Sequence, residues 1–69
     1  MNYNVQKISA NIKKRRLAIG LTRDELSRRA NVNYNTIIKL ESGANTNPTI
    51  KTLLGIAGVF ETSIEELIR

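Results

Sequence analysis

The apolar residues of this chain recur every three or four positions, and turn-forming residues interrupt that pattern at short intervals. The interruptions fall at Gly20, Asn31, Gly43, the Asn45–Pro48 stretch and Glu61–Ser63. They leave five short segments with the periodicity of amphipathic helices. No segment alternates with the period of two that is typical of a strand. The pattern therefore predicts an all-α fold of five helices.

The first segment runs from about Val5 to Ile19. Ile8 and Ile12 lie four residues apart, and Ile19 returns to the same side, which is the predicted buried side. Arg16 falls four residues after Ile12 on this stripe. Because a charge that faces a core is costly unless it is paired, Arg16 needs an acidic partner.

The second segment, from about Arg23 to Ala30, opens on a capping box formed by Thr22 and Glu25. The third segment begins after only Asn31–Val32, with Asn33 as its N-cap. Two short helices joined this tightly cross at a steep angle, as they do in a helix-turn-helix.

The fourth segment runs from about Thr49 to Phe60, and the fifth from Ile64 to Ile68 after a second capping box over Ser63–Glu66. The apolar residues of the fourth segment are predicted to share one buried stripe: Ile50, Leu53, Leu54, Ala57 and Phe60. Gly55 and Gly58 occupy predicted outward-facing positions of this segment. Either the two glycines merely lower the stability of this helix, or their lack of side chains lets a second chain approach it closely.

The composition narrows the functional classes. A chain of 69 residues allows one domain, which spans residues 1–69. Histidine and cysteine are absent, so the commonest general base and two of the commonest metal ligands are missing. We therefore expect no enzyme, no cofactor and no metal site.

The net charge of +5 is unevenly distributed. Residues 1–40 contain nine basic and two acidic residues, whereas residues 41–69 contain two basic and four acidic ones. The first part therefore attracts polyanions such as nucleic acids, although a merely soluble basic surface is the other interpretation. No apolar run approaches the roughly 18–20 residues of a membrane span, and the start MNYNVQKIS lacks the apolar stretch of a signal peptide. We expect a cytoplasmic location and no membrane partner.

From Leu21 onward, the order of residues matches a known family. The stretch LTRDELSRRANVNYNTIIKLESG resembles the Cro and phage-repressor type of helix-turn-helix, the XRE family, and NPTIKTLLGIAGVFETSIEELI is similar to the fourth and fifth helices of that family. The matching features are L-T-x-x-E-L, Ala30 before the turn, Val32 in the turn, I-x-x-L-E-x-G and N-P-[ST]. The resemblance implies a lambda-repressor-like domain of five helices. In that fold the second helix crosses the DNA backbone, and the third enters the major groove.

The third segment has an inner face of Ile37 and Leu40 and an unusual outer face. The outer face presents Tyr34, Asn35, Thr36, Ile38 and Lys39. Residues near the start of such a helix read bases. Asn35 matches the N6 and N7 of adenine, and Lys39 can donate to O6 and N7 of guanine. Tyr34 is placed for a phosphate or a thymine methyl group, and Ile38 for a thymine methyl group. The residues alone also allow Asn33 and Asn35 to be capping residues and Lys39 to be a solvated charge.

Two further places are predicted to touch DNA phosphates. The resemblance implies such a contact at Arg23, a position that is commonly glutamine in relatives, and the neighbouring Thr22 hydroxyl can cap its helix and touch a phosphate. The loop residues Asn45 and Thr46 offer amides and backbone N–H groups, although this loop has no lysine or arginine.

The resemblance also implies two structural features. The family pairs an arginine of the first helix with a glutamate directly after the last buried leucine of the third, and the matching residues are Arg16 and Glu41. Glu61 stands where relatives usually have a glycine in the left-handed conformation.

We predict a sequence-specific DNA-binding transcriptional regulator, a repressor that occupies a near-palindromic operator in double-stranded DNA. Two alternatives stay open: a DNA-binding antitoxin of a toxin–antitoxin pair, and a protein-interaction module that kept the fold but lost DNA binding. Because one helix-turn-helix reads only a few base pairs, we expect a weak homodimer formed mainly on DNA. The predicted pairing surface is the turn between the fourth and fifth segments together with the fifth segment, where Ile56, Val59, Ile64, Leu67 and Ile68 lie.

Overall fold

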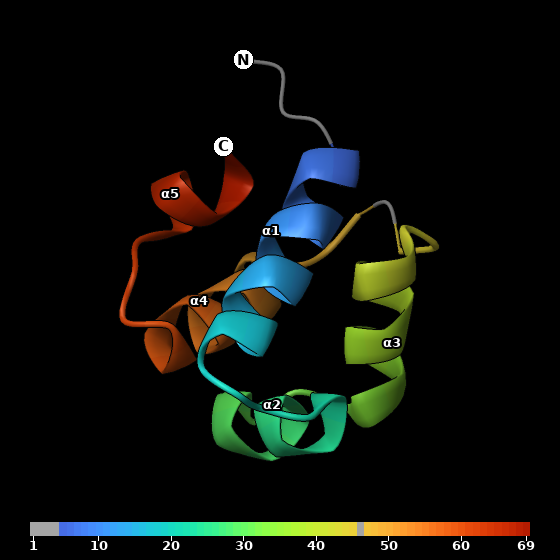
Figure 1. Cartoon of the computed structure of the whole chain (residues 1–69). Coiled ribbons are helices and arrows are strands. Elements are labelled where there is room, and N and C mark those ends of the chain that lie inside the picture. Colours follow the sequence, from blue (N-terminus) through green and yellow to red (C-terminus); the bar gives the residue numbers. More distant parts are fainter. Residues whose placement is uncertain (1–4, 46) are drawn as a thin grey trace.

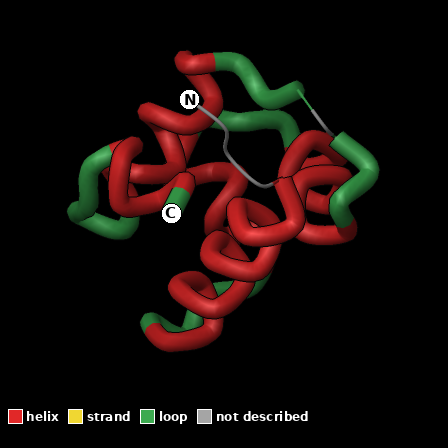
Figure 2. The backbone as a smooth tube through the Cα atoms, turned by 90° about the horizontal axis from the view of Figure 1, so that it is seen from above, coloured by secondary structure: helices red, strands yellow, loops and turns green. Residues whose placement is uncertain are grey.

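The computed structural model describes residues 5–45 and 47–69 and contains five helices joined by short turns (Figure 1). The helices are α1 (Val5–Ala18), α2 (Arg23–Ala30), α3 (Tyr34–Ser42), α4 (Ile50–Val59) and α5 (Ile64–Ile68). The described residues contain no strand, so the all-α prediction is confirmed (Figure 2). Where the sequence predicted a helix end, the end lies within one residue of its predicted place.

Local capping explains why the helices begin where they do. The Thr22 Oγ1 accepts from the Glu25 backbone N–H at 3.1 Å, and the Glu25 carboxylate accepts from the Thr22 backbone N–H at 2.9 Å. That second bond holds the pKa of Glu25 below its ordinary value. The capping box therefore contributes its stability at neutral pH and loses it as the pH falls through the lowered pKa of Glu25.

The second capping box forms only in part. The Ser63 Oγ accepts from the Glu66 backbone N–H at 3.1 Å, as predicted. The Glu66 carboxylate, however, lies 3.6 Å from the Arg15 guanidinium instead of returning to its own N-cap. Asn11 also reaches α5, because its Nδ2 donates to the Leu67 carbonyl at 3.1 Å. Contacts from α1 thus hold this five-residue helix.

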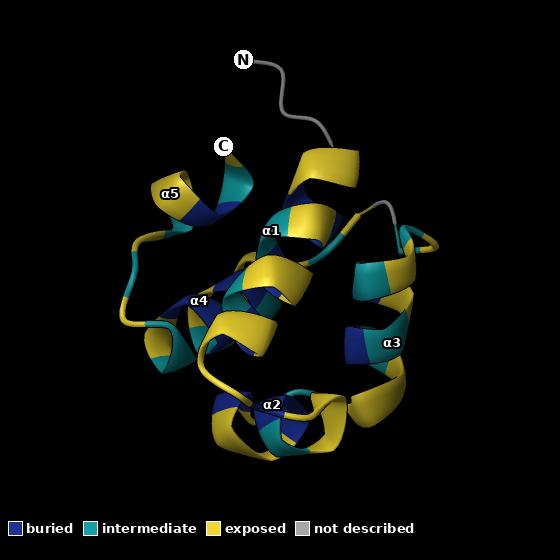
Figure 3. Cartoon of the chain, in the orientation of Figure 1, coloured by how far each residue is buried: buried dark blue, intermediate teal, exposed yellow. Residues whose placement is uncertain are grey.

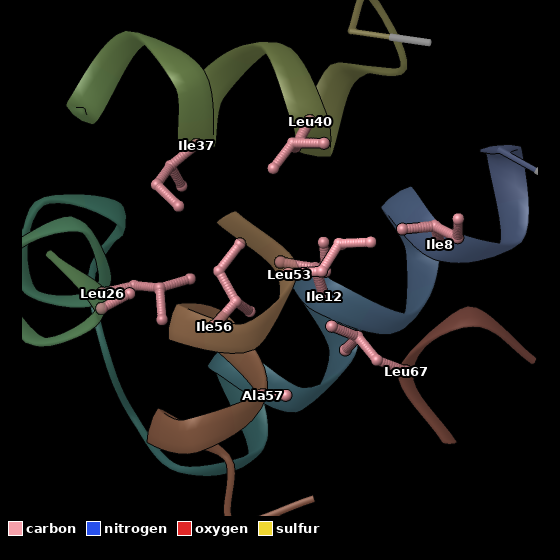
Figure 4. Close-up of a cluster of buried hydrophobic side chains, with 10 residues drawn as sticks. Ile8, Ile12, Leu26, Ile37, Leu40, Leu53, Ile56, Ala57 and Leu67 are labelled. Atoms are coloured by element: carbon pink, nitrogen blue, oxygen red, sulfur yellow. The ribbon is translucent and has the colours of Figure 1, made fainter. Parts of the chain in front are cut away.

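The five helices pack around one core. Helix α1 packs on α3 and α5, α2 packs on α3 and α4, and α4 packs on α5. Figure 4 shows the core side chains pointing toward one another from all five helices. The core members are Ile8, Ile12, Leu26, Ala30, Ile37, Leu40, Leu53, Ile56, Ala57 and Leu67. Figure 3 shows the outward faces of α1, α2 and α3 to be largely exposed.

Three predicted core positions are wrong. Ile19 is 52% exposed because α1 ends at Ala18, before the chain would turn this side chain inward. Ile50 and Leu54 are 65% and 57% exposed, and Ile56 is fully buried in their place. The buried stripe of α4 therefore runs through Leu53, Ile56 and Ala57, with Phe60 half-buried beside it. Since Ile56 and Leu67 are both fully buried, neither is available to a pairing surface, which corrects that part of the prediction.

The two glycines of α4 have different surroundings, which corrects the prediction that both face outward. A Cβ atom at Gly55 would lie 2.5 Å from the carbonyl oxygen of Ala30 in α2, whereas a Cβ at Gly58 would meet nothing within 4 Å. Gly55 therefore lets α4 approach the end of α2 within the chain. Only Gly58 is open.

Glu61 adopts the left-handed conformation with φ of 54°. This is the position where relatives usually have glycine, and the turn geometry has been kept without it. An ordinary residue in this conformation costs roughly 1–2 kcal/mol relative to the right-handed helical region.

Within residues 5–45 and 47–69, no helix is long and apolar enough to cross a membrane. The same residues contain no cluster of acidic side chains that could hold a metal ion.

Candidate nucleic-acid interface

The turn between α2 and α3 changes the direction of the chain within three residues. Asn31 takes the left-handed conformation, with φ of 56°, and its backbone N–H donates to the Arg28 carbonyl at 3.3 Å. The Val32 N–H donates to the Ser27 carbonyl at 2.9 Å. Asparagine tolerates this conformation better than most residues, so the turn suits its sequence. Figure 1 shows α3 leaving α2 at a steep angle, as predicted for a helix-turn-helix.

Helix α3 is anchored by its inner face and presents its outer face to solvent. Ile37 and Leu40 are buried, whereas Tyr34, Asn35 and Lys39 are exposed. Thr36 and Ile38 were also predicted on the outer face, but both are half-buried. Ile38 is therefore less exposed than expected.

Some polar side chains of α3 make hydrogen bonds within the chain, and others make none. The Asn33 Oδ1 accepts from the Asn35 backbone N–H at 2.8 Å, so Asn33 is the N-cap. In the described part of the chain, the side chains of Asn35 and Lys39 make no hydrogen bond or ion pair. Asn35 is therefore not a capping residue, and both side chains keep all their donors for another molecule.

A buried carboxylate lies behind this face, at the end of α3. The Glu41 side chain is 2% exposed and accepts from the Arg16 Nε at 2.7 Å and from the Arg16 Nη2 at 3.1 Å. The remaining Arg16 bond, from Nη1, runs to the Leu21 carbonyl at 2.7 Å. The predicted Arg16–Glu41 pair is confirmed, and it ties α1 to α3.

Glu41 binds a second arginine that the sequence analysis did not assign to it. The Arg23 Nε lies 3.1 Å from the Glu41 Oε1, and the Arg23 side chain is 44% exposed. Two guanidinium groups therefore share one carboxylate, which leaves the cluster with an excess positive charge. Arg23 braces α2 against α3 by this ion pair. No local signal could have revealed it, because the two residues are 18 positions apart.

The loop after α3 differs from its prediction. The backbone N–H of Asn45 donates to the Lys39 carbonyl at 3.0 Å, and that of Asn47 donates to the Asn45 Oδ1 at 3.0 Å. The N–H of Ala44 reaches the Ser42 Oγ at 3.3 Å. These N–H groups are engaged inside the loop, which leaves the Asn45 Nδ2 for an outside acceptor. Thr46, also predicted here, lies outside the described residues.

Lys51 is an exposed cation near this face that the sequence analysis overlooked. It lines a hollow of about 410 Å³ between the start of α4 and the α2–α3 turn, together with Asn33, Thr36 and Thr52. The loop itself contains no basic residue. A lysine in the first turn of the following helix was the signal available.

Comparisons with known proteins agree with this geometry. The sequence profile of the helix-turn-helix family matches residues 12–67. An HTH-type transcriptional regulator of Archaeoglobus fulgidus is 39% identical over 56 residues, which cover 81% of this chain and 78% of that protein. Another, of Coxiella burnetii, is 34% identical over 61 residues, or 88% of this chain. The chain spans only 28% of the length of the Coxiella protein.

Solved structures share the fold. The N-terminal DNA-binding domain of SinR from Bacillus subtilis superposes with a TM-score of 0.89 at 28% identity, over 93% of each chain. A second SinR structure, in complex with DNA, gives a TM-score of 0.85 at 29% identity and covers 90% of this chain and 98% of that one.

Proposed function

Because this chain belongs to the Cro and phage-repressor type of helix-turn-helix transcriptional regulators, which are DNA-binding proteins and not enzymes, we propose that it binds operator DNA with α3 in the major groove and acts as a repressor. The observation that carries this proposal is the outer face of α3. Asn35 and Lys39 keep their hydrogen-bonding groups unused there, and the Arg16–Glu41–Arg23 cluster near the end of the same helix carries an excess positive charge. The structure of SinR in complex with DNA supports the proposal, because SinR has the same fold as this chain.

Each residue has a role in this proposal. Asn35 and Lys39 read bases, and Tyr34 and Ile38 lie beside them for contacts with a thymine methyl group or a phosphate. Phosphate contacts come from Arg23, Thr22, Asn33, Thr36, Asn45, Thr46 and Lys51. Arg23 uses its Nε for Glu41, so its two terminal nitrogens are left to grip a phosphate in the forked geometry of arginine.

Asn35→Ala and Lys39→Ala are each expected to lose about 1–3 kcal/mol of binding free energy on the preferred site and little on random DNA. The reason is that each removes a base contact and leaves the phosphate contacts intact. Fluorescence anisotropy on both DNAs, after selection of the preferred site from a random pool, measures the difference. Equal losses on the two DNAs would contradict base reading by these residues.

Arg23→Ala is expected to weaken binding to every DNA sequence alike and to reduce the slope of log K against log salt concentration by about one. A phosphate contact carries no sequence information, which explains the uniform loss. The matched control is Arg69→Ala, an exposed arginine at the end of α5, which should leave the slope unchanged. A wild-type slope in Arg23→Ala would remove this residue from the backbone contacts.

We also propose that two copies occupy the two half-sites of a near-palindromic operator and pair weakly, mainly on DNA. Paired domains about 34–36 Å apart would read two successive major grooves, which multiplies the specificity of one short helix. A cytoplasmic location follows from this function as part of the same proposal. Retention on DNA-cellulose across a salt gradient tests the proposal against the alternative of a protein-interaction module.

A further inference from the structure

One apolar face of α4 is left uncovered by its own chain. Ile50 is 65% exposed and Leu54 is 57% exposed, and the next residue on the same face, Gly58, has open space where a side chain would stand. Beside this face lies a groove of about 450 Å³ with Leu54, Gly55, Gly58 and Val59 on one side and Arg29 with Ala30 on the other.

The order of large and small side chains along this face allows two copies of the face to fit together. A large side chain stands at position 50, another at 54, and none at 58. When two such helices pack antiparallel about a two-fold axis at Leu54, Ile50 of each copy faces Gly58 of its partner. Parallel packing would crowd the two Ile50 side chains together and leave both glycines facing a void.

Charge favours the same arrangement. Lys51 lies in the first turn of α4, and Glu61 follows its end. Both residues are exposed, and antiparallel packing brings the basic start of each α4 toward the end of the partner's α4, which the acidic Glu61 follows. Antiparallel helix dipoles also attract each other.

We propose that the groove face, defined as Ile50, Leu54 and Gly58, is the surface through which two copies of this chain pair, with their α4 helices antiparallel. This inference rests on the proposed operator binding, whose two half-sites bring the copies together. One helix pair buries less than the roughly 1,000 Å² typical of a stable interface, so the free protein stays largely monomeric.

Cross-linking tests the pairing without any DNA contact being assumed. The chain has no cysteine, so Leu54→Cys introduces a single thiol at the proposed axis. Under mild oxidant and at rising concentration, with and without a two-half-site DNA, this variant should form a disulfide-linked dimer. The control is Leu17→Cys, whose position on α1 is equally exposed at 58%. It should remain monomeric.

A swap of large and small residues tests the antiparallel register. Gly58→Leu should fill the space that receives Ile50 and should lower affinity for a two-half-site operator by about tenfold or more, with half-site affinity unchanged. Adding Ile50→Ala to that variant moves the large residue to the other end and should restore cooperative binding.

The outcomes separate this inference from the proposed function. Cooperative operator binding by Leu54→Cys without a disulfide, or equal cross-linking of both cysteine variants, would overturn the α4 pairing and leave DNA binding in place. Cross-linking at position 54 in a protein that binds no DNA would support the pairing and reject the proposed function. A Gly58→Leu variant that binds cooperatively would also overturn the register. The register would also be overturned if adding Ile50→Ala to Gly58→Leu did not restore cooperative binding while circular dichroism showed the single and double variants to be folded.

Discussion

Glu41→Ala is expected to lower the free energy of unfolding by about 3–5 kcal/mol, because it leaves the buried Arg16 guanidinium with no carboxylate. Arg16 would keep only its bond to the Leu21 carbonyl. A domain of this length has a total stability of roughly 3–10 kcal/mol, so the variant should lose a large fraction of its stability. Urea denaturation followed by circular dichroism measures the loss.

The matched control is Glu65→Ala, which breaks the Arg69–Glu65 pair. Both side chains of that pair are at least 70% exposed, and an exposed pair contributes only about 0–1 kcal/mol. Added salt should weaken the exposed pair and have little effect on the buried one. A melting temperature for Glu41→Ala equal to that of the wild type would contradict the buried pair.

Gly55→Ala is expected to destabilise the domain by about 1–3 kcal/mol, although alanine is the better helix former. The added Cβ would lie 2.5 Å from the Ala30 carbonyl oxygen, which is a backbone atom and cannot rotate away. Helices α2 and α4 would have to separate to admit it, and the core side chains between them would lose contact. Chemical denaturation of the purified variant gives the change in unfolding free energy.

Gly58→Ala, in the same helix, is expected to change the unfolding free energy in the opposite direction. Its Cβ meets nothing within 4 Å, so the gain in helix propensity should stabilise the domain by up to about 1 kcal/mol. Two substitutions of identical chemistry, three residues apart, should thus move stability in opposite directions. If Gly55→Ala proves as stable as the wild type, α4 does not approach Ala30 as closely as the structure shows.

The helix boundaries could be predicted because their signals are local. Thr22, Asn33 and Ser63 each accept a hydrogen bond from a backbone N–H two or three residues further on, and such a bond needs no knowledge of the rest of the chain. The stripe that begins with Ile8 and Ile12 was also readable, since polar residues flank each of these isoleucines on both sides.

The buried face of α4 could not be predicted in the same way. Seven of its ten residues are apolar or glycine at consecutive positions 53–59, so periodicity alone does not select one stripe. The orientation of the helix is fixed instead by the approach of Gly55 to Ala30, which are 25 positions apart in the sequence. In this orientation Ile56 faces inward and Leu54 faces outward.

In the candidate interface, too, some features could be predicted from local sequence and others could not. The exposed positions of α3 follow from the spacing of Ile37 and Leu40, so sequence reasoning reached them. The ion pair between Arg23 and Glu41 joins two helices, and it depends on the crossing angle that the α2–α3 turn produces. Such an angle is a property of the packed domain rather than of any short stretch of sequence.

The residues that position α3 are distinct from those proposed to read bases. Ile37, Leu40 and Glu41 hold the helix from within, whereas Asn35 and Lys39 hold nothing in the chain. Replacing the outer residues should therefore leave the folded state nearly as stable as before, since surface substitutions away from such contacts usually change stability by less than about 0.5 kcal/mol. Under the proposed function, the preferred DNA site can then change by single substitutions, each of which leaves a folded protein. Duplicated copies of this gene could diverge to recognise different sites while keeping one scaffold.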